Sequence, residues 1–180
     1  FACLALGAMF FIAFNFVTNA GWSTSIRRIA ESFTSYLPVM VVTSFVLILG
    51  FKHLYPWADP EQAHRLTGGK SIYLSQAFVI ARFVIFGLGC LVFKNLIVGN
   101  SLKQDETGDN NLTLQNLPRS VGFIAFFAIF FSMFSIDLLM SLLPSWYSTI
   151  FGIYAFAGMI QSTFALMAIM IVWLKDSKWV

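Results

Sequence analysis

The sequence predicts an all-α integral membrane protein, a polytopic bundle of transmembrane helices. Hydrophobic residues make up 58% of the 180 residues and charged residues only 11%, whereas soluble domains are about a quarter charged. The mean hydropathy is +0.79. Twenty-one Phe and five Trp suit a lipid-facing surface with aromatic residues at its interfaces. Water is therefore not the main solvent of this chain.

Five apolar runs have the roughly 17 to 25 residues that a helix needs to cross a hydrocarbon core of about 30 Å. They predict spanning helices at approximately residues 1–18, 36–54, 72–98, 121–143 and 147–174 of a single membrane domain. Helices are expected because backbone groups in lipid must bond internally, and because none of the runs alternates as a barrel strand does. The natural chain is expected to extend beyond both ends of this sequence, because Phe1 already lies inside an apolar run.

The connection after the first run predicts an interfacial amphipathic helix over about residues 21–35. Its apolar residues recur three and four positions apart: Trp22, Ile26, Ile29 and Phe33. Arg27, Arg28 and Glu31 face elsewhere. A helix with these two faces is expected to lie at the membrane surface with its apolar face in lipid.

The remaining connections differ in character. Residues 55–71 contain two prolines and a Gly-Gly pair, which predicts an irregular segment. Residues 99–119 are polar, acidic and rich in Asn, which predicts a long polar connection. Residues 144–146 predict only a tight turn, so that the helices over 121–143 and 147–174 are antiparallel neighbours.

The distribution of cationic residues favours one orientation. We call side one the face with the connections 21–35 and 99–119, and side two the face with the connections 55–71 and 144–146. Side one carries Arg27, Arg28, Lys103, Arg119, Lys175 and Lys178, and side two carries Lys52, Arg65 and Lys70. This excess favours side one as the cytoplasmic face.

Two charged residues fall inside predicted spans. Arg82 lies about 16 Å from side two and Asp137 about 10 Å from the same side, at 1.5 Å per helical residue. The offset of about 6 Å is within reach of an Arg side chain, so a buried pair is expected near the midplane. A single charge at such depth costs roughly 2.5 to 3.5 kcal/mol on insertion scales. The pair is either part of a proton or substrate route or a structural lock between two helices.

Further polar residues extend this pattern. Ser141 lies one turn from Asp137, and Tyr147, Tyr154 and Gln161 recur at seven-residue spacing. His53 stands at the side-two end of the second run, where a histidine can relay protons. The candidates for a proton pathway are therefore Asp137, Arg82, Tyr147, Tyr154, His53 and Ser141. Polar side chains also join helices in membrane bundles, and His53 beside aromatic residues also fits an interfacial anchor.

Several functions are not expected. The formal charge of +3 is spread over the connections, so nucleic-acid binding is excluded. Cys3 and Cys90 stand alone in apolar runs, and neither His53 nor His64 is expected at a helix centre, where a haem ligand would be needed. No catalytic residue, metal site or cofactor site is predicted in this chain.

One stretch carries a family resemblance. Residues 136–154 read IDLLMSLLPSWYSTIFGIY, which closely resembles the signature of the ActF-type membrane subunit of bacterial alternative complex III. Further similar segments are AGWSTSIRRIAE at 20–31, LYPW at 54–57, the residues from Lys70 to Arg82, and QDETGD at 104–109. Leu138, Leu143 and Ser145 stand where that family usually has Trp, Asp and His, so the turn has lost titratable groups.

The resemblance implies a ten-helix subunit, distantly similar to NrfD-type proteins, in the bacterial cytoplasmic membrane. Such a complex oxidises quinol and passes electrons to cytochrome c or a terminal oxidase. Haem c and iron-sulfur clusters belong to partner subunits, and quinone is a candidate ligand of the complex, with the better-supported quinol site in an NrfD-like sister subunit. The ActF-type subunit is generally proposed to help move protons.

Three functions are weighed on these grounds. The leading hypothesis is a non-redox membrane subunit of a respiratory quinol oxidoreductase, with a proton half-channel open to side two and a role in anchoring redox partners. A secondary transporter would instead bind a coupling ion at the midplane pair. A purely structural membrane anchor would need no titrating group at all.

Overall fold

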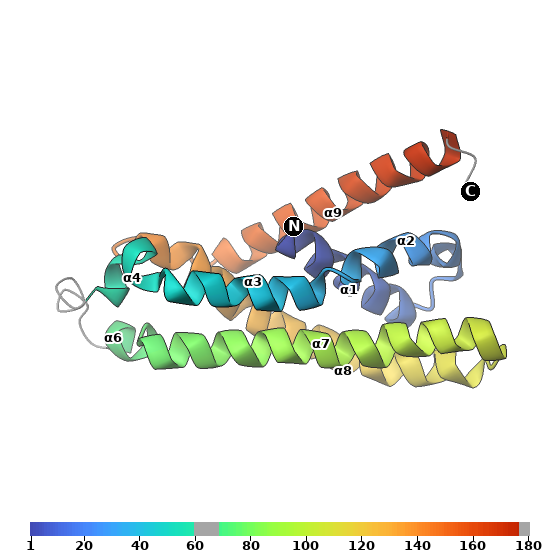
Figure 1. The fold of residues 1–180 in the computed structure, drawn as a ribbon, viewed down its shortest axis with the longest axis horizontal. Coiled ribbons are helices and arrows are strands. Elements are labelled where there is room, and N and C mark those ends of the chain that lie inside the picture. Colours follow the sequence, from blue (N-terminus) through green and yellow to red (C-terminus); the bar gives the residue numbers. More distant parts are fainter. Residues whose placement is uncertain (60–68, 177–180) are drawn as a thin grey trace.

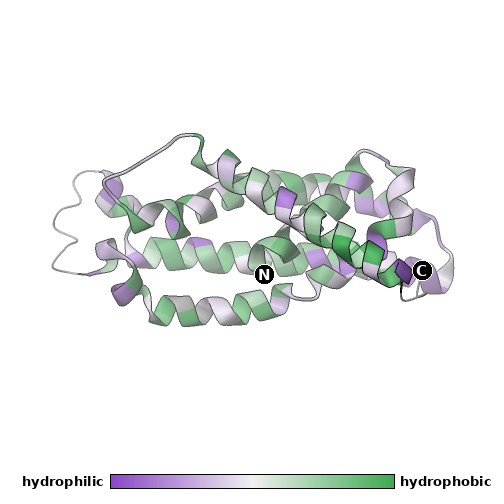
Figure 2. Cartoon of the chain, turned by 90° about the horizontal axis from the view of Figure 1, so that it is seen from above, coloured by the Kyte–Doolittle hydropathy of each residue, from purple (hydrophilic) through white to green (hydrophobic). Residues whose placement is uncertain are grey.

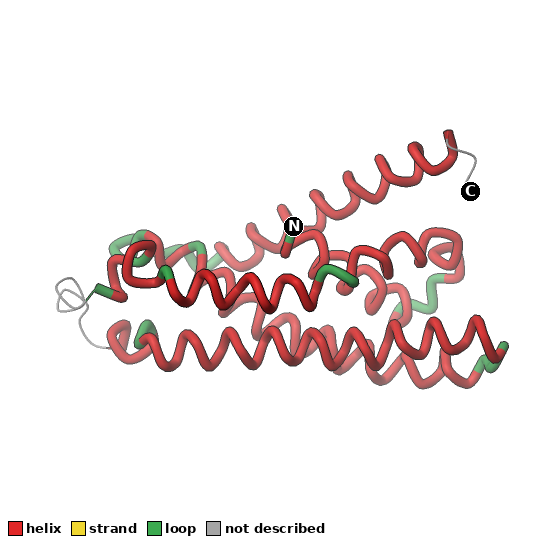
Figure 3. Tube along the Cα trace, viewed as in Figure 1, coloured by secondary structure: helices red, strands yellow, loops and turns green. Residues whose placement is uncertain are grey.

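The computed structural model describes residues 1–59 and 69–176, and within these ranges the fold is helical and contains no strand. The helices are α1 (Ala2–Val17), α2 (Thr24–Thr34), α3 (Leu37–Leu49), α4 (Phe51–Leu54), α6 (Gly69–Tyr73), α7 (Gln76–Thr107), α8 (Asn111–Leu138) and α9 (Phe151–Asp176). Short 3₁₀ turns are η1 (Gly21–Ser23), η2 (Pro56–Ala58) and η3 (Met140–Leu142). The helices form an elongated bundle from which α9 diverges toward its C-terminal end (Figures 1 and 3).

The described chain contains three helices that are long and apolar enough to cross a membrane: α7, α8 extended through Leu142, and α9. Apolar residues dominate the length of the bundle, and hydrophilic residues gather mostly toward its two ends (Figure 2). The prediction of a helical membrane protein is therefore supported. The prediction of five full spans is not met by the described residues. At 1.5 Å per residue α3 is about 20 Å long, which is shorter than a hydrocarbon core of about 30 Å.

The predicted second and third spans are each interrupted. Gly50, with φ −89° and ψ 1°, separates α3 from α4. Ser75, with φ −63° and ψ 138°, is extended and separates α6 from α7. The second interruption turns the short α6 away from the axis of α7, so that groups at the end of α6 face the side of α7.

The long polar connection predicted over residues 99–119 is wrong. α7 continues to Thr107 and α8 begins at Asn111, so the connection consists of residues 108–110 alone. Gly108 ends α7 with φ 68°, a left-handed conformation that glycine adopts without a steric penalty. The polar residues led to a wrong prediction because they form the last turns of α7 rather than a connection. α7 is about 48 Å long, so these turns extend past a hydrocarbon core of about 30 Å. Polar side chains are hydrated there.

The tight turn predicted at residues 144–146 is also longer than expected. α8 ends at Leu138, η3 follows, and α9 begins only at Phe151. Pro144 disfavours helical backbone at the residue before it, and Leu143 has φ −123° and ψ 84°. α9 is antiparallel to α8 and contacts it near Gly152, where an added Cβ would lie 3.5 Å from the hydroxyls of Ser132 and Ser135.

The main core lies between α1, α7 and α8 and is rich in phenylalanine. Phe86, Phe123 and Phe127 are almost completely buried, at 2%, 0% and 2% exposure. Their rings contact one another, with centroids 6.2 Å apart for Phe86 and Phe127 and 5.6 Å apart for Phe123 and Phe127. This apolar column occupies the middle of the bundle and separates its two polar ends.

The segment predicted to be amphipathic forms η1 and α2. Arg28 of α2 reaches Ser101 near the end of α7, whereas Val41 of α3 lies against Gly87 in its middle, so α2 runs along α7 and continues the direction of α3 (Figure 1). α2 buries Glu31 together with Ala30 and Thr34. Ile26 and Phe33 of the apolar stripe are partly buried against the main core, whereas Trp22 is 68% exposed.

Candidate functional site

The site is built on an ion pair between α7 and α8. Arg82 Nε donates a hydrogen bond to Asp137 Oδ2 at 2.7 Å, and Arg82 Nη2 donates to Asp137 Oδ1 at 3.0 Å. The two side chains are only 14% and 4% exposed. This bidentate geometry is one of the strong hydrogen-bonding arrangements of guanidinium and carboxylate groups. The predicted pair is therefore present, because the antiparallel α7 and α8 place both residues at one level.

The position of the pair along its helices follows from where these helices begin and end. Arg82 is six residues from the start of α7 at Gln76, a rise of about 9 Å, and Asp137 is the residue before the last of α8. The pair thus lies toward the side-two ends of α7 and α8. Its depth relative to the membrane midplane stays a prediction.

Arg82 also makes two contacts with Tyr73. Its Nη2 donates to the Tyr73 carbonyl oxygen at 2.8 Å, and its Cζ lies 4.1 Å from the centre of the Tyr73 ring. In a continuous helix this carbonyl would accept a hydrogen bond from the residue four positions on. The break at Ser75 leaves it available to the guanidinium instead. Arg82 therefore keeps polar partners even when Asp137 is neutral.

The segment Tyr55–Ala58 covers the pair at side two. The Tyr55 hydroxyl donates to the Leu138 carbonyl at 3.0 Å, and the Trp57 indole N–H donates to Ser141 Oγ at 3.0 Å. Ser141 Oγ in turn donates to the Asp137 carbonyl. The last carbonyls of a helix have no partner within the helix, and this segment supplies donors to them. We call residues 55–58 the aromatic cap.

The aromatic cap is buried and fixed at its far end. Tyr55 and Trp57 are 3% and 4% exposed, and their ring centroids are 5.2 Å apart. Gln76 Nε2, at the start of α7, donates to the Ala58 carbonyl at 3.0 Å. Both ends of the cap are thus attached to the helices that hold the pair, and the cap must move before water can reach Asp137.

The electrostatics of the two neighbouring tyrosines follow from this burial. Burial, with a smaller contribution from the negative charge of Asp137, raises the pKa of Tyr55 to about 12. Burial and then the Asp137 charge likewise raise the pKa of Tyr73 to about 12. Both phenols are therefore neutral at physiological pH, and they contribute dipoles and hydrogen-bond donors to the site but no charge.

The structure brings together only part of the predicted pathway. Asp137, Arg82 and Ser141 form one connected group. Tyr147 and Tyr154 are 71% and 75% exposed and do not reach this group. The spanning helix α9 buries Met159, Thr163 and Met167, so the face with Tyr154 and Gln161 points away from the bundle.

The other polar candidates at side two are exposed or undescribed. His53 is exposed on α4. Lys70 Nζ donates to the Pro144 carbonyl at 3.3 Å and lies 5.6 Å from the centre of the Tyr147 ring, which places Tyr147 beside α6. His64, expected to be solvated, lies outside the described residues.

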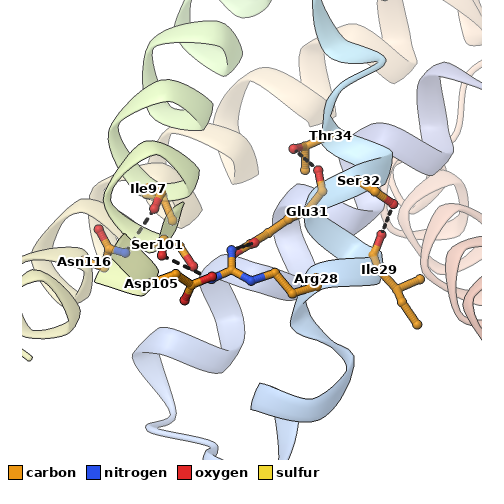
Figure 4. A network of polar contacts seen from close by, with 9 residues as sticks. All are labelled: Arg28, Ile29, Glu31, Ser32, Thr34, Ile97, Ser101, Asp105 and Asn116. Atoms are coloured by element: carbon orange, nitrogen blue, oxygen red, sulfur yellow. Dashed lines mark hydrogen bonds and ion pairs between the residues drawn. The ribbon is translucent and has the colours of Figure 1, made fainter. Parts of the chain in front are cut away.

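Sequence reasoning missed the contributions of Tyr73, Trp57 and Gln76. The available signal was a proline between two aromatic residues directly after an apolar run, at Tyr55-Pro56-Trp57, which indicates a chain that bends back over the helix ends. It also missed a second polar group at side one, where Arg28 pairs with Glu31 and Asp105 (Figure 4). Isolated charges in a polar connection gave no sign that they would pair between α2 and α7.

Among the residues that the structure describes, no group of three or more His, Cys, Asp or Glu side chains is placed to hold a metal ion. Comparison with protein-family models and with characterised proteins gave no match for this chain.

Proposed function

We propose that this chain is a non-redox membrane subunit of a respiratory quinol oxidoreductase of the alternative complex III type. It contributes a proton half-channel that opens to side two, and it anchors redox partner subunits to the bilayer. The observation that carries the proton role is the buried Arg82–Asp137 pair under a hydrogen-bonded cap. The resemblance of residues 136–154 to the ActF-type subunit supports the respiratory setting.

A buried pair of this kind is poorly explained by stability alone. Removing two ions from water costs several kcal/mol per ion, and replacing such a pair by apolar side chains is often neutral or stabilising. Ionisable residues inside membrane segments therefore mark ion and proton pathways by default. The arrangement at Asp137 suits that role, because Arg82 has two further contacts on Tyr73 that persist when the carboxylate is protonated.

In the proposed mechanism Asp137 is the group that gains and loses the proton. Opening of the aromatic cap breaks the bonds from Trp57 to Ser141 and from Tyr55 to Leu138, and water from side two reaches the carboxylate. The proton binds an Asp137 oxygen, and Arg82 retains its contacts on Tyr73. Closing of the cap then isolates the neutral carboxyl from side two. Ser141 keeps its hydrogen bond to the Asp137 carbonyl throughout.

The other candidates have smaller parts in this proposal. His53 is exposed at side two, where it can collect protons for the half-channel. Tyr147 and Tyr154 face away from the pair, so the proposed pathway does not depend on them. Haem c and iron-sulfur clusters would belong to partner subunits, and quinone to an NrfD-like sister subunit, in the bacterial cytoplasmic membrane. Side one would be the cytoplasmic face.

Affinity purification of the tagged full-length protein from its native membranes tests this function. Co-purification with haem c and iron-sulfur subunits, together with quinol oxidation, is expected. A protein that purifies alone and drives ion-coupled transport in vesicles would show a secondary transporter. Intact assembly with an unchanged ratio of protons to electrons in Asp137 variants would leave only the anchoring role.

A further inference from the structure

The end of the bundle opposite to the Arg82–Asp137 pair contains a second group of charged side chains, of which Glu31 is buried. Arg28 on α2 pairs with Glu31 on the same helix and with Asp105 on α7, and its Nη2 donates to the Ser101 carbonyl at 3.2 Å. Figure 4 shows Arg28 reaching across from α2 to Ser101 and Asp105, with Asn116 of α8 beyond them. We call this place the side-one junction.

Three oxygen atoms near this junction are buried and have no hydrogen-bond partner among the described residues. They are Glu31 Oε1, Asn116 Oδ1 and Ser120 Oγ. Their residues are 5%, 0% and 0% exposed. The orientation of the Asn116 amide is fixed by its Nδ2, which donates to the Ile97 carbonyl at 3.0 Å, so Oδ1 is the atom left over.

Two of these atoms, those of Asn116 and Ser120, follow one line into the bundle. The two residues are four positions apart on α8 and therefore lie on one face, about 6 Å apart along the helix axis. The same face continues with Phe123 and Phe127, which are 0% and 2% exposed. The polar line thus ends at Ser120, and the phenylalanine column closes it from the Arg82–Asp137 pair.

A polar cavity of about 310 Å³ lies at the side-one junction. The cavity is lined by residues of α2, α7 and the connection after α7, among them Thr24, Arg28, Gln104, Asp105 and Asn110. Arg28 and Asp105 therefore belong both to the cavity wall and to the junction. A cavity of this size has room for several water molecules, each of which occupies about 30 Å³ in the liquid.

We propose that the side-one junction binds internal water, in an inlet that leads from this cavity past Glu31 and Asn116 and ends at Ser120. Buried polar groups are nearly always hydrogen-bonded, and a buried water typically makes about three hydrogen bonds to otherwise unsatisfied groups. The Glu31 carboxylate on α2 and the Asn116 amide oxygen and Ser120 hydroxyl on α8 are groups of this kind. The inlet gives water and protons from side one access to Glu31, whether or not the chain is a respiratory subunit.

The accessibility of Ser120 to a small soluble cation tests the inlet. We would introduce Ser120→Cys together with Cys3→Ser into the full-length protein in sealed vesicles, and keep Cys90 as an internal control. Cys90 is also 0% exposed, but it lies in the apolar core. Ag⁺ would be added from side one, and the thiols that remain would be counted with a maleimide after denaturation.

The water inlet predicts that the thiol of Ser120→Cys reacts with Ag⁺ at least tenfold faster than Cys90, and only from side one. Equal rates for the two thiols, or reaction from side two alone, would overturn the proposal. No reaction of either thiol would do the same.

A second measurement covers the case in which the cysteine variant does not fold. Ser120→Ala removes a hydroxyl that either has no partner or binds water. Ser135→Ala is the matched control on the same helix, because Ser135 is also 0% exposed and its hydroxyl donates to the Ser132 carbonyl at 2.8 Å. Water at Ser120 predicts that both variants lower Tm to a similar extent. A higher Tm for Ser120→Ala alone would contradict the proposal.

Discussion

Asp137 shows how much a single buried carboxylate requires from its surroundings. Its two oxygens accept from Arg82, its own backbone carbonyl accepts from Ser141, and the aromatic cap closes the site at side two. Arg82 alone supplies the compensating charge in this group. A change at one member of the pair therefore exposes the cost of burying the other.

The pair predicts a simple non-additivity. Asp137→Asn leaves Arg82 buried without its counter-ion, and breaking a buried pair in this way typically costs about 3 to 5 kcal/mol. The double variant Asp137→Asn with Arg82→Gln removes both charges and should recover most of the lost stability. Thermal unfolding and yield of the purified protein measure this. Equal losses in the single and double variants would show that the two residues are not energetically coupled.

The cap predicts a smaller and local effect. Trp57→Phe keeps an aromatic ring but removes the N–H that binds Ser141, and a single hydrogen bond contributes about 0.5 to 1.5 kcal/mol. A loss of that size is expected in the free energy of unfolding. Trp22→Phe is the control, because Trp22 is 68% exposed, and it should have little effect. Equal effects of the two substitutions would argue against a structural role of the cap.

Tyr73 predicts a dependence on alkaline pH. Its pKa is raised from 10.0 to about 12 by burial and by the Asp137 charge. Because the pKa of Tyr73 is higher in the folded state than in the unfolded state, its contribution to stability is complete below the unfolded-state pKa. That contribution is lost as the pH rises through the folded-state pKa. Stability should therefore fall between about pH 10 and 12, and less so in Tyr73→Phe. Unfolding temperatures measured across this range would refute the assignment if both proteins lost stability equally.

The ion pair between Arg82 and Asp137 could be predicted from the sequence, but the residues that surround it could not. Arg82 and Asp137 could be matched because helical rise alone gives the level of each residue in antiparallel helices. The contact of Arg82 with Tyr73 depends on the break at Ser75, and no Gly or Pro at that point signals it. Tyr154 was assigned to the pathway on spacing alone, and spacing does not say which face of a helix is buried.

At the scale of elements, the described chain contains both continuous and broken helices. α7 and α8 form a long hairpin around Gly108, whereas the predicted second span is divided at Gly50. Hydropathy located every apolar run, because lipid requires such runs. Hydropathy could not locate the helix ends, because polar turns beyond the hydrocarbon core remain helical where a neighbouring helix contacts them. One such contact joins α8 to α7, where the Thr113 hydroxyl donates a hydrogen bond to Gln104 at 2.7 Å.

Close approach of α1 and α9 depends on Gly7. A Cβ at this position would lie 2.1 Å from Thr163 Oγ1, closer than real side chains come. Gly7→Ala should therefore destabilise the protein by about 1 to 3 kcal/mol, as overpacking does. Gly158 on α9 has nothing within 4 Å of the point that a Cβ would occupy, so Gly158→Ala should be neutral or stabilising. Thermal unfolding of both variants decides, and a neutral Gly7→Ala would mean that the two helices can separate without cost.

The whole molecule has a group of paired charges at each end and an apolar middle. The side-two end holds Arg82 and Asp137, and the side-one end holds Arg28, Glu31 and Asp105. The phenylalanine column around Phe127 lies between them. The proposed proton role requires access from each face without a continuous open path, and it is in keeping with this division. The composition predicted the membrane setting, but only the contacts of Arg28 with Ser101 and Asp105 on α7 revealed the group at the second end.

The ratio of protons translocated to electrons transferred tests the proton role of Asp137 most directly. The complex containing Asp137→Asn with Arg82→Gln would be reconstituted in sealed vesicles and compared with the unaltered complex during quinol oxidation. A double variant that assembles and oxidises quinol at a normal rate, but translocates fewer protons per electron, is the expected result. An unchanged ratio in the assembled double variant would contradict the proton role and leave the pair as a structural connection between α7 and α8.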